Sequence, residues 1–227
     1  MDGPTNRPAT PPPSSSRHQL PLTIRPVRST TDLATTISLF KTYTNGLGID
    51  LSYQDFDTEL ACMPGAYAPP YGELLLAVRK GDTSHSNDND NDNDNDKDEE
   101  VLGCIALRPL YLTPNPNPTT TPIPTSTPTP PSTSISISSQ TPTPPPTTHS
   151  ELKRLYVTPP ARGLGVGGAL VNAMLTVARE RGYDEVYLDT LKSMRAAVGL
   201  YRGMGFEEIE KYYEGAREGT VFLRLRL

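Results

Sequence analysis

The sequence predicts one mixed α/β domain with low-complexity segments attached to it. Apolar residues recur with the strand period in some segments and with the helix period in others. The resulting order is β-α-α-β-β followed by β-α-β-α-β-β, which is typical of a mixed α/β domain. Most of the 25 prolines and an acidic repeat lie outside these segments, and about 150 residues remain, enough for a single core.

The first half of the chain is expected to form two helices between strands. A helix from Thr31 or Asp32 to Phe40 or Tyr43 is indicated by apolar residues spaced by four and three positions. Two apolar runs separated by a turn-like insert predict a hairpin with an expanded loop. The expected elements are strands 22–27, 73–80 and 101–108, helix 31–43, and a second helical segment that begins at Ser52 and includes Phe56, Leu60 and Met63.

The second half is denser in regular structure. Residues 164–181 predict a long helix, because Val166, Leu170 and Met174 recur on one face and Gly182 follows as a cap. The remaining expected elements are strands 152–157, 185–191, 206–210 and 221–227 and helix 193–202.

Three segments have compositions that are unable to bury a core. We expect residues 1–20 to be a disordered Pro/Ser/Thr-rich tail. A domain over 21–227 would then be interrupted by two disordered inserts, an Asn/Asp repeat at 82–100 and a Pro/Thr/Ser-rich stretch at 109–149. The repeat lacks the glycine that a helix-loop-helix calcium site requires, which favours a solvated loop.

Histidine and cysteine usage excludes several kinds of site. His18, His85 and His149 all lie in the low-complexity segments, so the predicted core has no histidine for Ser-His-Asp or Cys-His catalysis or for a zinc site. We therefore expect no metal. Two cysteines, no secretory signal and no apolar run of about 20 residues predict a cytoplasmic protein, with the nucleus left open. No membrane or nucleic-acid partner is expected, and the oligomeric state stays open.

The most informative stretch is a glycine-rich loop before the long helix. Its open backbone and the helix N-terminus favour a phosphate group, with Arg162 as counter-charge. The loop comprises Arg162, Gly163, Leu164, Gly165, Val166, Gly167 and Gly168.

One interpretation of this loop is a dinucleotide site in an oxidoreductase. Residues 163–168 fit GxGxxG, and Asp189 follows at a strand end, where it could bind a ribose hydroxyl. Against this, residues 158–162 separate the first glycine from its strand, and too few residues follow Gly168 for a repeated βαβ unit.

The second interpretation comes from a family. Arg162-x-x-Gly165-x-Gly167, five residues beyond a strand, resembles the acetyl-CoA pyrophosphate loop of the GNAT acetyltransferase superfamily. The preceding ELKRLYV and the following Ala196-Ala197-x-x-Leu200-Tyr201-x-x-x-Gly205-Phe206 are similar to that superfamily as well. The resemblance is best over 150–206 and extends to 22–81 and 101–108. It implies a mixed, mostly antiparallel sheet flanked by helices and an acyltransferase that moves acetyl from acetyl-CoA, its co-substrate, to a primary amine.

The resemblance also implies roles for individual residues. Backbone groups of Leu155, Tyr156 and Val157 would pair with the pantetheine arm, and the glycine loop would bind the pyrophosphate. Tyr201 would protonate the departing thiolate, and Glu151 would be a general base if partial burial raised its pKa. Ser193 would bind the cofactor, since Met194 stands where many members have asparagine.

The absence of a core histidine or an activated cysteine favours direct transfer to the amine of a small molecule or peptide. A non-catalytic CoA-binding or interaction protein is a further alternative, because it would keep the same glycine loop.

Overall fold

The computed structural model describes residues 22–48, 56–80, 99–112 and 145–227. These residues form a seven-stranded sheet of order β1-β2-β3-β4-β5-β7-β6, in which only β4 and β5 are parallel. The mostly antiparallel mixed sheet is thereby confirmed. The strands are β1 (Leu22–Pro26), β2 (Glu73–Lys80), β3 (Glu99–Pro109), β4 (His149–Val157), β5 (Glu185–Leu191), β6 (Glu207–Ile209) and β7 (Thr220–Arg226).

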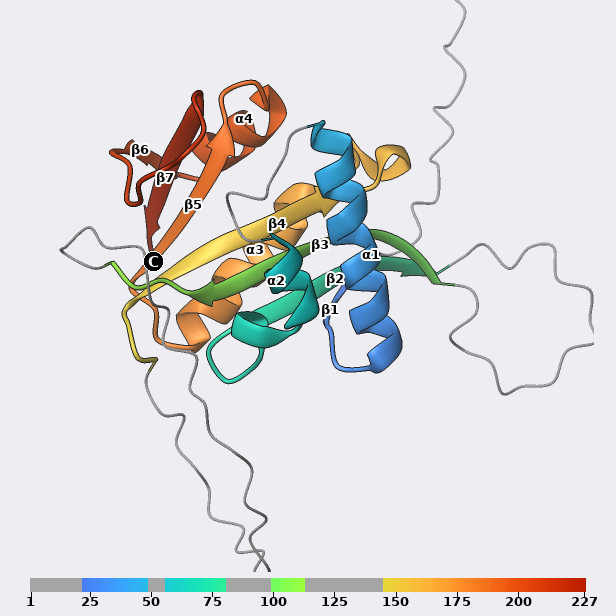
Figure 1. The fold of residues 1–227 in the computed structure, drawn as a ribbon. Coiled ribbons are helices and arrows are strands. Elements are labelled where there is room, and N and C mark those ends of the chain that lie inside the picture. Colours follow the sequence, from blue (N-terminus) through green and yellow to red (C-terminus); the bar gives the residue numbers. More distant parts are fainter. Residues whose placement is uncertain (1–21, 49–55, 81–98, 113–144) are drawn as a thin grey trace, which may run out of the picture.

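Helices cover both faces of this sheet. Figure 1 shows α1 and α2 crossing one face and α3 lying behind the other. Helix α1 begins where the Ser29 hydroxyl accepts the Asp32 N–H at 3.0 Å, and it ends at Gly48 in the left-handed conformation. The helices are α1 (Thr30–Leu47), α2 (Phe56–Ala61), α3 (Val166–Glu180) and α4 (Arg195–Gly203), with 3₁₀ turns η2 (Gly65–Tyr67) and η3 (Pro159–Ala161).

Each face of the sheet has its own hydrophobic core. On the α3 face the largest contribution comes from α3 itself, whose Leu170 and Met174 are fully buried. On the α1–α2 face Phe40 of α1 packs edge-on against Tyr67, with ring centroids 6.2 Å apart. Cys104 is also buried there, and burial raises the pKa of its thiol, in keeping with a packed cysteine. The two cores fix which way each β4 side chain points.

The bounds of strands 73–80 and 185–191 were predicted to the residue. The predicted inserts, however, include residues that belong to β3 and β4. Glu99 and Glu100 belong to β3, since their backbones pair with Lys80 and Arg79 of β2, and ion pairs join Arg25 to Glu99 at 2.9 Å and Arg79 to Glu100. His149 begins β4, is half-buried and packs edge-on against Tyr187, so its assignment to the Pro/Thr/Ser-rich insert is wrong. Composition alone had assigned these residues to the neighbouring low-complexity runs.

The disordered tail expected at 1–20 lies outside the described residues. The same holds for most of the two inserts, 82–98 and 113–144. Within the described ranges, no helix is long and apolar enough to cross a membrane.

Candidate functional site

Strands β4 and β5 form a fork. They pair over three positions and then diverge, so the β5-facing edge of residues 152–157 has no strand partner. Figure 1 shows the two strands separating toward their C-terminal ends. The unpaired backbone groups on this edge can hydrogen-bond to an extended ligand laid along it as an additional strand. The three register pairs are His149↔Glu185, Ser150↔Val186 and Glu151↔Tyr187.

A β-bulge lies at the opening of the fork. Lys153 pairs with Ala106 and Tyr156 with Cys104, so β4 has one residue more than β3 in this interval. Arg154 lies in the bulge with a φ of 57°, and it alone among the described non-glycine residues has a positive φ. Because of the extra residue, side chains on either side of the bulge alternate out of phase. Leu152, Leu155 and Val157 consequently all face the α3 side, and Tyr156 faces the α1–α2 side.

The glycine loop lies between β4 and α3, after the 3₁₀ turn η3. Gly163 and Gly165 have φ values of 79° and 81°, and a Cβ at either position would meet no atom within 4 Å. The first helical hydrogen bond joins the Ala169 N–H to the Gly165 carbonyl at 3.0 Å. In the described part of the chain the N–H groups of 166–168 therefore have no acceptor. A helix N-terminus of this kind favours an anion.

Helix α4 closes one side of this region. A Cβ at Gly167 would lie 3.5 Å from Leu200 and 3.6 Å from Val157. The end of β4, the start of α3 and the inner face of α4 therefore meet at these residues. Arg162 is exposed beside them, and its Nε donates to the Val157 carbonyl at 3.2 Å. The fold thus brings together the residues expected to bind the pantetheine arm of acetyl-CoA and those expected to bind its pyrophosphate.

Tyr201 projects from the inner face of α4. Its ring packs edge-on against Phe206 at 5.5 Å, and the side chain is almost fully buried. Burial raises the pKa of its hydroxyl, and Tyr43 and Asp189 add to that rise. The hydroxyl therefore stays protonated at neutral pH, close enough to Asp189 of β5 to feel its charge.

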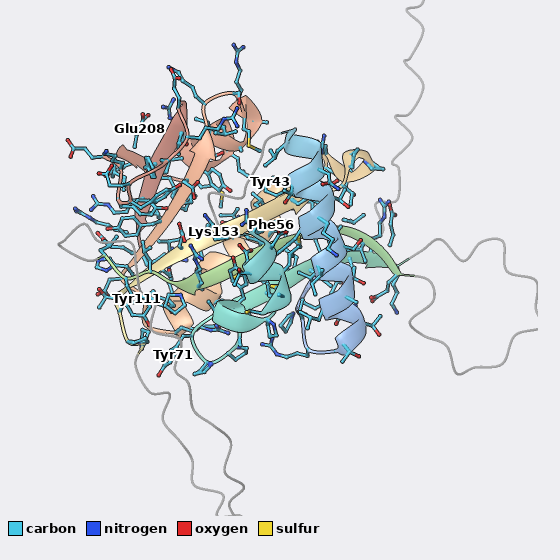
Figure 2. All side chains as sticks on the ribbon, viewed as in Figure 1. Tyr43, Phe56, Tyr71, Tyr111, Lys153 and Glu208 are labelled. Carbon is cyan, nitrogen blue, oxygen red and sulfur yellow. The ribbon has the colours of Figure 1, made fainter. Side chains whose placement is uncertain are left out.

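A network of charges that includes Lys153, which Figure 2 labels, occupies the base of the fork. Lys153 donates to Asp189 at 2.8 Å and lies 3.6 Å from Glu151. Two neighbouring tyrosines of the β6–β7 loop reach the same carboxylates. Tyr212 donates to Glu151 at 2.8 Å, and Tyr213 donates to Asp189 at 3.2 Å. The loop is thereby tied to both strands of the fork.

The pKa expected for Glu151 is wrong. Burial alone would raise it, but Lys153 and Arg108 outweigh burial, with hydrogen bonds from Tyr212 and Arg108. Together they lower the pKa of Glu151 to about 2. A carboxylate held this way is a poor proton acceptor near neutral pH. The geometry instead gives Glu151 the part of an anchor for Lys153 and Tyr212.

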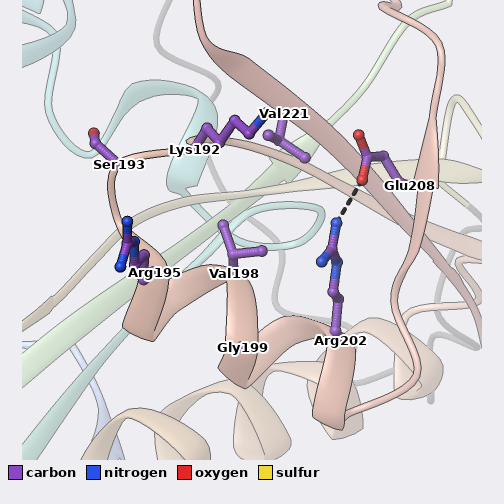
Figure 3. Close-up of a pocket in the computed structure, with 8 residues that line it drawn as sticks. All are labelled: Lys192, Ser193, Arg195, Val198, Gly199, Arg202, Glu208 and Val221. Atoms are coloured by element: carbon purple, nitrogen blue, oxygen red, sulfur yellow. Dashed lines mark hydrogen bonds and ion pairs between the residues drawn. The ribbon is translucent and has the colours of Figure 1, made fainter.

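Two further sequence candidates have distinct surroundings. Asp189 is engaged by Lys153 and Tyr213, which leaves the dinucleotide interpretation without its ribose-binding acid. Ser193 lies at the turn before α4, at the edge of a hollow between that helix and β6–β7 (Figure 3). The hollow also contains the exposed ion pair between Arg202 and Glu208 at 2.6 Å. In the described ranges, no group of three or more His, Cys, Asp or Glu is placed to hold a metal ion.

Several residues of the site were missed in the sequence. These are Glu59, Arg108, Lys153, Arg154, Tyr212 and Tyr213. The two adjacent cations at 153 and 154 break the alternation of the strand, and that break was an available signal for the bulge. The tyrosines belong to the 207–220 loop, which was expected to flank the thioester, but their individual partners are distant along the chain.

Comparison with known proteins places the chain in a family. The model of the Acetyltransferase (GNAT) family matches residues 93–206, half of the chain. An uncharacterized N-acetyltransferase of Dictyostelium discoideum is 34% identical over 216 residues, covering 83% of this chain and 92% of that protein. An uncharacterized N-acetyltransferase of Schizosaccharomyces pombe is 28% identical over 206 residues, covering 91% and 95%.

Solved structures agree on the fold. A GNAT-family acetyltransferase from Staphylococcus aureus superimposes with a TM-score of 0.56 at 16% identity, covering 91% of this chain and 99% of that one.

Proposed function

This chain belongs to the GNAT acetyltransferase family and is an N-acetyltransferase, and we propose that it transfers acetyl from acetyl-CoA directly to a primary amine of a small molecule or peptide. The observation that carries the proposal is that the open edge of β4 is followed, after η3, by a glycine loop whose N–H groups at 166–168 have no acceptor among the described residues. A pantetheine arm extended along 155–157 would place the pyrophosphate at 162–168.

In this proposal the backbone of β4 holds the donor. Groups of Leu155, Tyr156 and Val157 on the open edge bind the pantetheine arm, and an N–H of the same segment stabilises the oxyanion of the tetrahedral intermediate. The unpaired N–H groups of Val166, Gly167 and Gly168 bind the pyrophosphate, with Arg162, Gly163, Leu164 and Gly165 around it. Ser193, at the turn before α4, is retained as a cofactor contact.

Tyr201 supplies the proton in the second half of the reaction. The amine attacks the thioester carbon, the C–S bond breaks, and the thiolate takes the proton of the phenol. The position of Tyr201 on α4, next to Leu200 where that helix meets the start of α3, supports this assignment, and its hydroxyl is protonated at neutral pH. The amine must arrive neutral, and water is the proposed proton acceptor because the pKa of Glu151 is too low for that part.

The acceptor approaches over the α1–α2 face, which carries Tyr43, Lys153 and the β6–β7 loop (Figure 2). Counted together, Arg108 and Lys153 balance Glu151 and Asp189, so the base of the fork has no net charge. A network of this kind does not select acceptors by attracting a strongly cationic group. The proposal therefore favours amines with a neutral or mixed-charge neighbourhood over polyamines.

Product analysis tests this proposal. Purified protein is incubated with acetyl-CoA and a mixture of free amino acids, spermidine and short peptides, and the products are identified by mass spectrometry. The proposal predicts an N-acetylated amine formed in proportion to released CoA thiol. Thiol release to water alone, or acetylation of spermidine in preference to every other amine, would contradict it.

A further inference from the structure

The bulge in β4 places an arginine in the left-handed backbone conformation, which arginine rarely adopts. Left-handed φ values are common for glycine and occur in asparagine or aspartate, but they are disfavoured for a long side chain such as arginine. Arg154 nevertheless has a φ of 57°. Something outside the strand must therefore hold it there, and its side chain shows what does.

The side chain of Arg154 is fixed by helix α2. Its Nε and Nη2 donate to the two carboxylate oxygens of Glu59 at 2.9 and 2.6 Å, a bidentate ion pair. Its guanidinium carbon lies 4.9 Å from the centre of the Phe56 ring, also on α2. Tyr67 donates to the same Glu59 carboxylate at 3.0 Å, and both ends of the ion pair are largely buried. The bulge is thus clamped to a helix 95 residues away in sequence.

The ion pair between Arg154 and Glu59 lies directly before residues 155–157, so it affects the orientation of the open edge. Removing the extra residue from the register would exchange the faces of the three residues that follow, since side chains alternate along a strand. Leu155 and Val157 would turn away from the α3 face, and Tyr156 would leave the α1–α2 core. The backbone N–H groups on the fork side would exchange with those on the β3 side at the same time.

From this geometry we infer that Arg154 is a positioning residue, which through its ion pair with Glu59 sets the direction of the N–H groups at 155–157 toward the thioester carbonyl. The inference rests on the proposed function, because it assumes that acetyl-CoA lies along this edge. Arg154 itself touches neither donor nor acceptor in this account. The same clamp links α2, which borders the acceptor face, to the strand that holds the donor.

Isotope-edited infrared spectroscopy of bound [1-¹³C]acetyl-CoA tests the inference without any acceptor. A hydrogen bond from an N–H to the thioester carbonyl lowers its stretching frequency, so the wild type should show a downshifted band. Two full-length variants are compared, Glu59→Gln/Arg154→Ala and Glu59→Gln/Arg154→Gly. The shared Glu59→Gln change avoids leaving a buried carboxylate without its cation in either variant.

The two variants differ only in whether residue 154 tolerates the left-handed conformation. The alanine variant is expected to lose the downshift, and the glycine variant to retain part of it. Both should still bind CoA by calorimetry, because the glycine loop is unchanged, and the alanine variant should bind it more weakly than the glycine variant, because the backbone that pairs with the pantetheine arm is displaced. A retained downshift in the alanine variant, or its equal loss in both, would overturn the inference.

A milder variant covers the case in which the alanine variant does not fold. Arg154→Lys keeps the cation and most of the stem but is unable to form two parallel hydrogen bonds. Partial loss of the downshift with CoA affinity retained supports the clamp, and an unchanged band overturns it. If the wild type binds no acetyl-CoA at all, the proposed function itself fails, and the inference fails with it.

Discussion

Lys153 and Asp189 are joined by an ion pair of 2.8 Å across the point where β4 and β5 separate. The last backbone pair of the fork is Glu151 with Tyr187. Lys153 and Asp189 each lie two positions further along their strands. A side-chain link therefore replaces main-chain pairing at the opening of the fork. Both side chains are mostly buried, with exposed fractions of 8% and 11%.

Lys153→Met should reduce the free energy of unfolding by about 3 kcal/mol, because removing one partner leaves a buried carboxylate without its cation. Urea unfolding measures this. The matched control is Lys211→Met, which breaks an exposed pair with Glu214 and should change stability by less than about 0.5 kcal/mol. Equal changes in the free energy of unfolding would show that the ion pair at the fork contributes no more to stability than an exposed pair.

Acid should weaken the fold through Glu151. Its pKa is about 2 in the folded protein against an ordinary 4.5, so the ionised form stabilises the folded state above about pH 4.5. This contribution, about 3 kcal/mol, is lost as pH falls from 4.5 toward 2. Stability measured against pH should therefore show Glu151→Gln well below wild type at pH 7, with the gap reduced by about half at pH 3 and nearly closed at pH 2. A gap that stays constant over this range would contradict the lowered pKa.

Gly165→Ala tests the conformation of the glycine loop. The added methyl group meets no atom, so any cost comes from the positive φ, about 1–2 kcal/mol for a residue other than glycine. Gly199→Ala is the control, since that glycine lies within α4 with equal space around it and alanine is favoured there by about 1 kcal/mol. Thermal unfolding should move in opposite directions for the two variants. The same direction for both would mean that the loop conformation differs in solution.

Tyr201→Phe should lower kcat about 10²-fold while leaving the KM for acetyl-CoA unchanged, as expected for loss of a general acid. Tyr183→Phe is a suitable comparison, because that tyrosine belongs to the same core and its hydroxyl donates to the Tyr71 carbonyl. It should affect stability and leave kcat alone. Steady-state thiol release measures both. An equal fall in kcat would assign Tyr201 a packing role only.

Periodicity in the sequence was sufficient for most elements. The strands at 73–80 and 185–191, the long helix α3 and its glycine cap at Gly182 depend on local pattern and backbone geometry. The mostly antiparallel order required the family resemblance, because strand alternation does not specify neighbours. The ends of β3 and β4 were missed, since their side chains find partners only in the folded chain.

The electrostatics of the site were beyond local pattern. Glu151 was expected to be a base of raised pKa, because burial was foreseeable and its partners were not. Arg108 lies on the neighbouring strand and Tyr212 in a loop 61 residues later. The same limit applies to Arg154, whose partner Glu59 is distant in sequence. Charge pairs across a sheet depend on register, and register is a tertiary property.

Calorimetric titration with acetyl-CoA tests the central claim most directly, with NAD⁺ titrated alongside. The account predicts micromolar binding of acetyl-CoA to the wild type and to Arg179→Glu, a matched charge reversal at the far end of α3. Arg162→Glu should abolish that binding, because it places a negative charge beside the proposed pyrophosphate site. NAD⁺ should not bind. Binding of NAD⁺ alone, or acetyl-CoA binding unaffected by Arg162→Glu, would contradict the account.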